Sequence, residues 1–335
     1  MKNNVIYILV LLLLAGCEGN FFDLNYQSVK PKDNFEYLWN ECNEKYAYFE
    51  LKKINWDSIR EEYQQYLYME MTDDSLFSVL GGMLSELKDD HTNLISNFNI
   101  SRFGVRYLGQ DNFDWRIIED HYIGHDYFIS GPFKHQFLSH HNIGYIRFAE
   151  FPGSINDQNI DYVLSKYRHT DGLILDLREN GGGAVTDIFN LLGRFIDKKT
   201  LIYYSRIKNG IAHDAFSAPQ PVYIYPKGKK QYLKKVIMLT DRGTYSAGSV
   251  TALSTKAMPN ITLMGDTTGG GLGLPNGGQL PNGWRYRFSV TQALTLDLSP
   301  DYEQGVPPDR TVLFDWNNLE KDEILDAAIQ EIVNH

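Results

Sequence analysis

The second half of the chain alternates short apolar runs with segments whose apolar residues recur at helical spacing. The runs are rich in β-branched, leucine and aromatic residues, which favours short buried strands. We expect strands at Ile143–Phe148, Gly172–Leu177, Leu201–Arg206, Val222–Tyr225, Val236–Leu239 and Ile261–Met264. We expect helices at Asn156–Tyr167, Ala184–Ile196, Ala247–Lys256 and Lys321–Val333. This alternation predicts an α/β core at residues 141–335.

The residues before this core divide into shorter segments. Apolar side chains recur at helical spacing from Phe35 to Tyr66, and residues 72–75 are typical of the start of a further helix that would reach about Leu87. We therefore expect an N-terminal helical segment at residues 33–92. Residues 93–140 are rich in aromatic residues and glycine, which predicts a short β-rich linker region.

The charge balance excludes one class of partner. The chain has 32 Lys and Arg against 42 Asp and Glu, so its formal net charge is −10. Nucleic-acid binding needs a basic surface, and we expect no nucleic-acid partner. The one dense group of lysines is predicted to be a solvated turn with its flank, and it comprises Lys227, Lys229, Lys230, Lys234 and Lys235.

The first residues are typical of a secretory signal peptide. A cation at Lys2 precedes ten apolar residues, Val5–Leu14, a run shorter than the ~20 residues that span a bilayer. The following Ala15-Gly16-Cys17 resembles the lipobox of bacterial lipoproteins, which implies removal of residues 1–16 and lipidation of Cys17. Residues 17–32 would then be a tether to a membrane of the bacterial cell envelope, on its periplasmic or surface face. An ordinary cleaved signal peptide is the alternative.

The remaining cysteine and the histidines give no metal site. With Cys17 lipidated, Cys42 has no partner for a disulfide, and its apolar helical surroundings predict a buried small hydrophobic residue. Five histidines crowd the central region without the spacing of a metal motif, so we expect solvent-facing or loop residues and no metal. They are His121, His125, His135, His140 and His141.

Three glycine-rich segments carry the chemistry. In the first, an apolar run ends in Arg178 and leads to Gly181, Gly182 and Gly183, ahead of an expected helix. Consecutive glycines let backbone N–H groups point at a reacting atom, as an oxyanion hole requires. A phosphate-binding loop is the alternative, although the Lys-Ser/Thr of a Walker motif and the full Gly-x-Gly-x-x-Gly spacing are absent.

In the second segment, a strand is followed by a tight turn that places Ser246 at the start of a helix, between Gly243 and Gly248. A serine at such a turn presents its hydroxyl above the sheet, and the N–H of the next residue, Ala247, can bind an oxyanion. A simple helix cap is the alternative. The third segment, Gly269–Gly271, is followed by Glu303 in a Glu-Gln-Gly-Val sequence, and by itself it could be a surface turn.

The order of these segments resembles the C-terminal processing (tail-specific) protease family. In that family a strand ending in Asp-Leu-Arg-x-Asn-x-Gly-Gly precedes the catalytic serine, a glycine-rich loop and a Gly-Val-x-Pro-Asp segment. The sequence Asp89-Asp90-His91-Thr92 matches a further motif of the family. The resemblance covers roughly residues 33–315 and implies a ClpP/crotonase-like α/β core with the helical segment packed before it. Only about fifty residues separate His91 from the first core strand, so no full PDZ domain is expected.

The glycine loop departs from the processing-protease branch, which uses a Ser-Lys dyad. The position that matches its lysine is Gly271, and the sequence has no lysine between Lys256 and Lys321. The loop instead resembles the tricorn-protease branch, in which a histidine activates the serine.

Carried over by this resemblance, Ser246 matches the nucleophile, His91 the base and Glu303 the supporting acid. Asp90 stands where tricorn has a serine beside its histidine, and is a second candidate for orienting the imidazole. Backbone N–H groups of Gly182 or Gly183, together with Ala247, would bind the oxyanion.

The resemblance therefore implies a lipid-anchored serine endopeptidase that hydrolyses polypeptides without a cofactor. The rival is a non-catalytic protein that binds an apolar ligand or a peptide, since the same fold module occurs in interphotoreceptor retinoid-binding protein. A nucleotide-binding lipoprotein is a more distant alternative.

Overall fold

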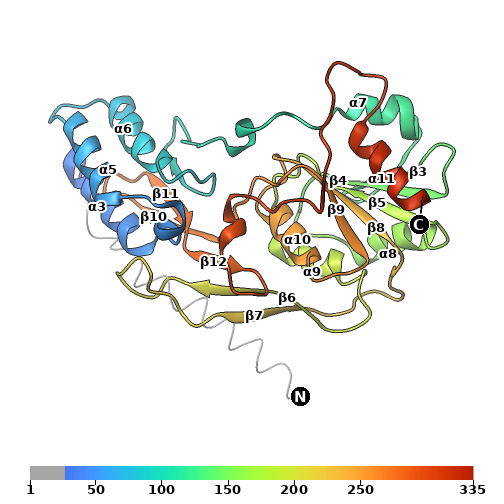
Figure 1. The fold of residues 1–335 in the computed structure, drawn as a ribbon. Coiled ribbons are helices and arrows are strands. Elements are labelled where there is room, and N and C mark those ends of the chain that lie inside the picture. Colours follow the sequence, from blue (N-terminus) through green and yellow to red (C-terminus); the bar gives the residue numbers. More distant parts are fainter. Residues whose placement is uncertain (1–26, 335) are drawn as a thin grey trace. The chain divides into compact units, whose positions relative to one another are not determined.

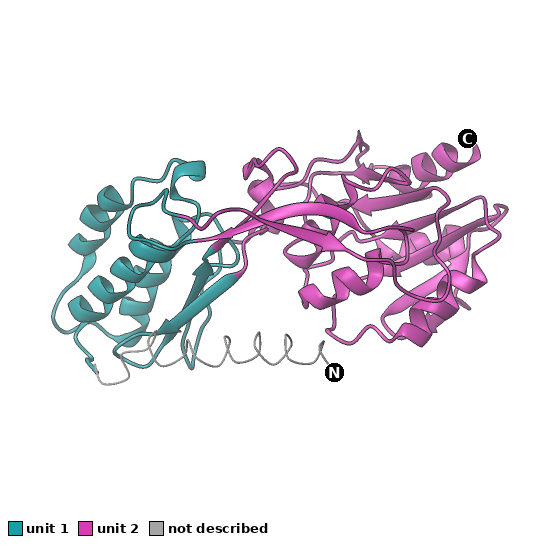
Figure 2. Cartoon of the chain, turned by 90° about the horizontal axis from the view of Figure 1, so that it is seen from below, with its two compact units in different colours: residues 1–103, 208–215, 275–290 teal, residues 104–207, 216–274, 291–335 magenta. Residues whose placement is uncertain are grey.

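The computed structural model describes residues 27–334 (Figure 1). The expected signal peptide, Cys17 and the first part of the tether lie outside these residues. The chain forms two compact units (Figure 2). Unit 1 comprises residues up to 103 together with 208–215 and 275–290, and unit 2 comprises residues 104–207, 216–274 and 291–335. Each unit therefore combines segments that are distant in the sequence, and residues 93–140 are divided between the two units.

Unit 1 begins with helices at the positions that the apolar spacing predicts. They are α3 (Pro31–Lys45), α4 (Phe49–Lys52), α5 (Trp56–Tyr63), the short η1 (Gln64–Tyr66) and α6 (Asp73–Ser85). Pro31 opens α3, where its missing N–H costs nothing, and the Thr72 hydroxyl accepts a hydrogen bond from the Ser75 N–H at the start of α6. Cys42 lies on the buried face of α3, which confirms its prediction as a buried residue.

A small antiparallel sheet completes unit 1, in the order β1-β11-β10. Its strands are β1 (Asn93–Ile95), β10 (Pro275–Gln279) and β11 (Arg285–Ser289). The sequence analysis did not predict β10 and β11. The Tyr286 hydroxyl donates a hydrogen bond to Glu41 of α3, so this late hairpin is fastened to the first helix.

Unit 2 is built on a seven-stranded sheet in the order β13-β9-β8-β5-β4-β3-β2. Neighbouring strands from β13 to β4 run parallel, whereas β3 and β2 form an antiparallel edge. The strands are β2 (Phe128–Ser130), β3 (Phe133–Phe137), β4 (Ile143–Phe148), β5 (Gly172–Asp176), β8 (Val236–Thr240), β9 (Ile261–Gly265) and β13 (Arg310–Thr311). Four of the six strands predicted for the core, β4, β5, β8 and β9, lie in this sheet, and the α/β fold class is confirmed.

Helices cover both faces of this sheet (Figure 1). One face packs against α8 (Asp157–Lys166), α9 (Val185–Leu192) and α10 (Ala247–Thr255), and the other against α7 (Trp115–Ile118) and α11 (Glu323–Val333). In β5, Leu173 and Leu175 belong to the first core and Ile174 to the second. Strands that are buried on both faces read as continuous apolar runs, which is why the sequence located them well.

The remaining elements of unit 2 lie outside the main sheet. A second sheet has the order β12-β6-β7 and consists of β6 (Thr200–Ile207), β7 (Gln220–Ile224) and β12 (Thr291–Leu294). Residues 104–127 hold the short helical segments η2 (Val105–Leu108) and η3 (Glu119–Ile123) as well as α7, and η4 (Asp301–Gln304) lies near the end. The expected β-rich character of residues 93–140 is therefore wrong for residues 104–127.

His135 departs from its prediction. The other four central histidines are exposed as expected, but His135 in β3 is fully buried. Its ring nitrogens lie 2.9 Å from the Ser130 hydroxyl and 2.8 Å from the Tyr167 hydroxyl. Burial lowers the pKa of His135 to about 4, so the ring is neutral at ordinary pH. Because each ring nitrogen has a hydroxyl partner, the polar ring is buried with its hydrogen bonds satisfied.

The parallel strands bring three loops to one edge of the main sheet. Strands β5, β8 and β9 are neighbours, and their carboxyl ends lie at Asp176, Thr240 and Gly265. The loops that follow them contain the three glycine-rich segments that the sequence analysis identified. Ligand sites of parallel α/β sheets form at such carboxyl ends. Among the described residues, no helix is both long and apolar enough to cross a membrane.

Candidate active site

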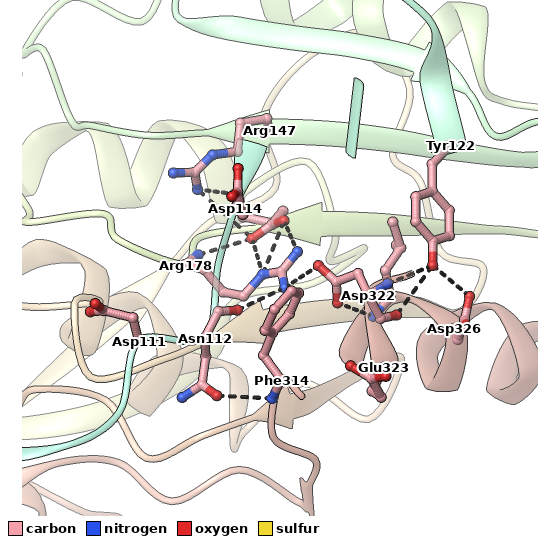
Figure 3. Close-up of polar contacts among 12 residues, drawn as sticks. Asp111, Asn112, Asp114, Tyr122, Arg147, Arg178, Phe314, Asp322, Glu323 and Asp326 are labelled. Atoms are coloured by element: carbon pink, nitrogen blue, oxygen red, sulfur yellow. Dashed lines mark hydrogen bonds and ion pairs between the residues drawn. The ribbon is translucent and has the colours of Figure 1, made fainter. Parts of the chain in front are cut away.

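A buried cluster of charges fixes the end of β5 (Figure 3). The Arg178 guanidinium is fully buried and lies 2.6 Å from carboxylate oxygens of both Asp176 and Asp322. It also donates a hydrogen bond to the backbone carbonyl of Asn112. Burial alone would raise the pKa of Asp176, but Arg178 and Arg147 outweigh it and hold this pKa below its usual value. The strand therefore ends at a rigid point, immediately before the glycine turn.

The turn after β5 is organised by Asn180. Its side-chain amide donates to the Phe148 carbonyl at 2.8 Å, and its side-chain oxygen accepts from the Gly182 N–H at 2.9 Å. Gly182 and Gly183 have φ values of +95° and +134°, which L side chains rarely adopt. A Cβ at Gly182 would lie 2.7 Å from the Ser246 Cβ, so the turn packs directly against the candidate nucleophile.

Ser246 occupies the strand-to-helix turn that the sequence predicted. It stands at the N-terminus of α10 with φ 55° and ψ −120°, and its side chain makes no capping hydrogen bond. A non-glycine residue rarely adopts positive φ, and such strain persists where the surroundings enforce it. The Ser246 N–H donates to the Gly270 carbonyl at 3.0 Å, and the preceding Tyr245 N–H donates to the Asn180 carbonyl at 2.9 Å. The serine is thus held between the two other glycine-rich loops.

Asp241 joins the two turns, and the sequence analysis did not identify it. Its carboxylate accepts hydrogen bonds from the N–H of Glu179, at 2.8 Å, and from the N–H of Thr244, at 3.0 Å. Burial raises the pKa of this carboxyl, and the Glu179 N–H and the Arg178 charge act in the opposite direction. The residue lies directly after β8, and only the folded sheet shows that it faces the neighbouring turn.

Two backbone N–H groups near Ser246 have no hydrogen-bond acceptor within the described residues. Within residues 27–334, the N–H groups of Gly183 and Ala247 donate no hydrogen bond to the protein. The Gly182 N–H is instead used inside the turn by Asn180. The structure therefore gives the expected oxyanion donors different roles: Gly183 and Ala247 are available as donors, whereas Gly182 allows the close approach to Ser246.

Glu303 lies against the third glycine loop. Its carboxylate is buried and accepts hydrogen bonds from the N–H groups of Leu272, at 2.8 Å, and Gly273, at 3.2 Å. Its carbonyl accepts from the Gly271 N–H at 3.0 Å. Since the Gly270 carbonyl binds the Ser246 N–H, the loop links Glu303 to the serine turn within unit 2.

Gly271 cannot carry a side chain in this conformation. Its φ is +70°, and a Cβ there would lie 2.2 Å from the ring of Tyr245. A lysine at this position, as in the processing-protease branch, would have to displace the tyrosine next to Ser246. The packing of the loop thus leaves no room for the lysine whose absence the sequence analysis noted.

His91 belongs to unit 1, in the turn before β1. Its N–H donates to the Asp89 carboxylate at 2.8 Å, and Ser289 of β11 donates to the same carboxylate at 2.9 Å. Burial would raise the pKa of Asp89, but the charges of Lys52 and His91 and hydrogen bonds from His91 and Ser289 hold it below its usual value. Sequence reasoning singled out Asp90 as the neighbouring acid, whereas Asp89 is the carboxylate that holds the His91 backbone.

No cluster of three or more His, Cys, Asp or Glu suited to a metal occurs in the described part of the chain.

Comparisons with known proteins agree with this geometry. Residues 142–312 match the model of peptidase family S41, and residues 28–85 match the tricorn protease C1 domain. A crystal structure of a protein from Parabacteroides merdae is 36% identical, with a TM-score of 0.87 over 91% of this chain and 98% of that one. The tricorn protease structure shares the fold at 16% identity and a TM-score of 0.58, over 91% of this chain and 37% of that one.

Curated relatives match over a shorter range. The carboxy-terminal processing protease CtpA of Bacillus subtilis is 26% identical over 172 residues, which are 51% of this chain and 35% of the relative. The match thus spans about a third of the length of that relative.

Neighbouring glycines offer a matched test of the packing around Ser246. A Cβ added at Gly181 meets nothing within 4 Å, whereas one at Gly182 meets Ser246, Tyr245 and Ala247 at 2.7–2.9 Å. We expect Gly182→Ala to lower the free energy of unfolding by at least about 2 kcal/mol, through overpacking and backbone strain. Gly181→Ala should stay within about 0.5 kcal/mol of the wild type in the same denaturant titration. Equal effects of the two substitutions would contradict the assigned packing.

Proposed function

This chain belongs to peptidase family S41, and on that premise we propose that it is a serine endopeptidase with Ser246 as its nucleophile. The observation that carries the proposal is the strained turn at Ser246, which does not cap its helix and lies near two N–H groups without a protein acceptor, those of Gly183 and Ala247. Serine nucleophiles of hydrolases occupy strained strand-to-helix turns of this kind. A protein that only binds an apolar ligand gives no reason to keep a serine in this conformation.

The proposed reaction uses the imidazole of His91 as the base. The Ser246 hydroxyl attacks the scissile carbonyl carbon while His91 takes its proton, and His91 later gives a proton to the leaving amine. Water then hydrolyses the acyl-enzyme by the same steps in reverse. This assignment is supported by the match of His91 to the tricorn base and by Gly271, which leaves the loop without the lysine of the other branch.

The negative charge on the carbonyl oxygen would be stabilised by the N–H groups of Gly183 and Ala247. Each donor of an oxyanion hole typically contributes roughly 2.7–4 kcal/mol to the transition state. Glu303 would support the base, since its carboxylate binds N–H groups of the glycine loop whose Gly270 carbonyl accepts from the Ser246 N–H. Asp89 would keep the turn of His91 in place. The mechanism needs no cofactor.

We further propose that the substrates are polypeptides outside the cytoplasm, reached from a lipid anchor at Cys17. The support is the lipobox-like Leu14-Ala15-Gly16-Cys17 after the apolar run. A single acyl chain binds membranes only marginally, so stable anchoring implies the several chains of a bacterial lipoprotein.

Substitution of the nucleophile tests the enzyme proposal. Ser246→Ala should abolish peptide hydrolysis and labelling by a fluorophosphonate probe, because both need the hydroxyl, while the thermal unfolding midpoint stays close to that of the wild type. Mass spectrometry of the labelled wild type should place the probe on Ser246, and Ser165→Ala, at an exposed serine of α8, is the matched control. Hydrolysis by a well-folded Ser246→Ala protein would refute the serine mechanism.

The identity of the base is tested by pH. If a neutral imidazole activates the serine, kcat/KM should fall as the pH drops through about 6.5, where an unperturbed imidazole takes up a proton. His91→Ala should lose nearly as much activity as Ser246→Ala, and the double variant little more, because members of one catalytic unit are not additive. Glu303→Gln should cost less than either. Near-normal cleavage by His91→Ala would move the base to another residue.

Lipidation is tested by mass. The intact mass of the membrane-bound protein should correspond to a chain that begins at Cys17 and carries acyl groups, and Cys17→Ser should leave the membrane fraction or fail to mature. An unmodified Cys17 in the membrane-bound form would show that the anchor is elsewhere, without affecting the enzyme proposal.

A further inference from the structure

A cavity lies in unit 2, between the C-terminal end of α8 and the connection from β7 to β8. Its volume is about 330 Å³, which falls at the lower end of the range for small-ligand sites. Leu164, Tyr232 and Leu233 give it an apolar wall. The lining also contains four cations and one carboxylate, namely Arg168, Lys229, Lys230, Lys234 and Asp161.

The lysine-bearing connection is held in a defined conformation. The Lys227 N–H donates to the Gly193 carbonyl at 2.8 Å, and the Tyr232 N–H donates to the Arg194 carbonyl at 2.7 Å. Gly228 between them has φ +81°, and a Cβ there would lie 2.7 Å from the Asp161 carboxylate. The turn therefore needs glycine and presents the following lysines at a fixed place.

The cations of this cavity are only partly compensated. The single carboxylate, that of Asp161, lies 3.3 Å from the buried Arg194 guanidinium, so its charge is already engaged. Lys234 donates to the Thr170 carbonyl at 2.6 Å. Lys229 and Lys230 are exposed and make no hydrogen bond or ion pair with any residue in the described range 27–334.

Lys229, Lys230 and Lys234 are exposed, as the sequence predicted for this turn and its flank, and they line a concave site with an apolar wall. In a chain whose net charge is −10, such a group of cations concentrates positive potential at one place.

We propose that this pocket binds a phosphate group, carried by a small organic phosphate or by a lipid headgroup. Phosphate suits the site because its several oxygens can accept from two ammonium groups and a guanidinium at once, which Lys229, Lys230 and Arg168 provide. The apolar wall would contact the organic part of the ligand. The proposal is independent of the peptidase function, since none of these residues belongs to the candidate active site.

Binding is measured without detergent on the full chain with Cys17→Ser, so that the vesicles stay intact and a lipid anchor makes no contribution. One arm titrates glycerol 3-phosphate by calorimetry. The other measures flotation with phosphatidylcholine vesicles that contain or lack phosphatidic acid. Glycerol 3-phosphate binding identifies a soluble source of the phosphate, and binding only to phosphatidic acid vesicles identifies a lipid headgroup.

Two double variants with the same change of charge decide the outcome. Lys229→Gln/Lys230→Gln should weaken binding at least about tenfold, because it removes two of the charge-assisted donors. Lys30→Gln/Lys32→Gln, two exposed lysines of unit 1, should leave the affinity within about twofold. Equal losses in the two double variants, or no saturable binding of either probe, would overturn the proposal.

Discussion

The two ion pairs of Arg178 hold the carboxyl end of β5, and the geometry of the candidate site begins there. Taking a guanidinium and two carboxylates out of water costs several kcal/mol per ion, so the cluster is not by itself a source of net stability. It is nevertheless hard to remove, because losing one partner of a buried pair costs about 3–5 kcal/mol. What the cluster contributes is position: it ties β5 to the start of α11 through Asp322 and to the Asn112 carbonyl.

From this fixed point the positions of the reactive groups follow by hydrogen bonds. Asn180 shapes the glycine turn, and Asp241 fastens that turn to the one that carries the serine. Two non-glycine residues with positive φ, Glu179 and Ser246, lie in these joined turns. Backbone strain of about 1–3 kcal/mol at such a residue persists only when its surroundings determine the conformation from several sides. Asp241 supplies that constraint for Glu179, and Gly270 and Gly182 supply it for Ser246.

The sequence predicted the parts of this chain whose information is local. Core strands such as β5 are buried on both faces, so their continuous apolar runs were plain, and the serine turn was marked by its glycines. In unit 1 the helices and the β-rich character around β1 were predicted, but the hairpin of β10 and β11 was missed. Strand β10 contributes Pro-Asn-Gly-Gly-Gln, which has no strand pattern and pairs only once the chain returns from unit 2. His135 was misjudged for a related reason, since its partner Tyr167 comes near it only in the folded chain. The hydrogen bond from the Gly182 N–H to the Asn180 side chain likewise could not be predicted from the residue pattern.

The glycine at position 271, where the processing-protease branch has a lysine, restricts the chemistry of the whole site. At Gly271 the space that a lysine would need is filled by the Tyr245 ring, and the loop itself is held by the Glu303 carboxylate. Restoring a lysine would therefore require Tyr245 to move, and that residue carries the backbone bond to Asn180 beside the nucleophile. A serine without an adjacent base is a weak nucleophile. On the proposed mechanism the base must then come from outside this loop, and the proposal assigns this role to His91, whose backbone N–H is bound by the Asp89 carboxylate.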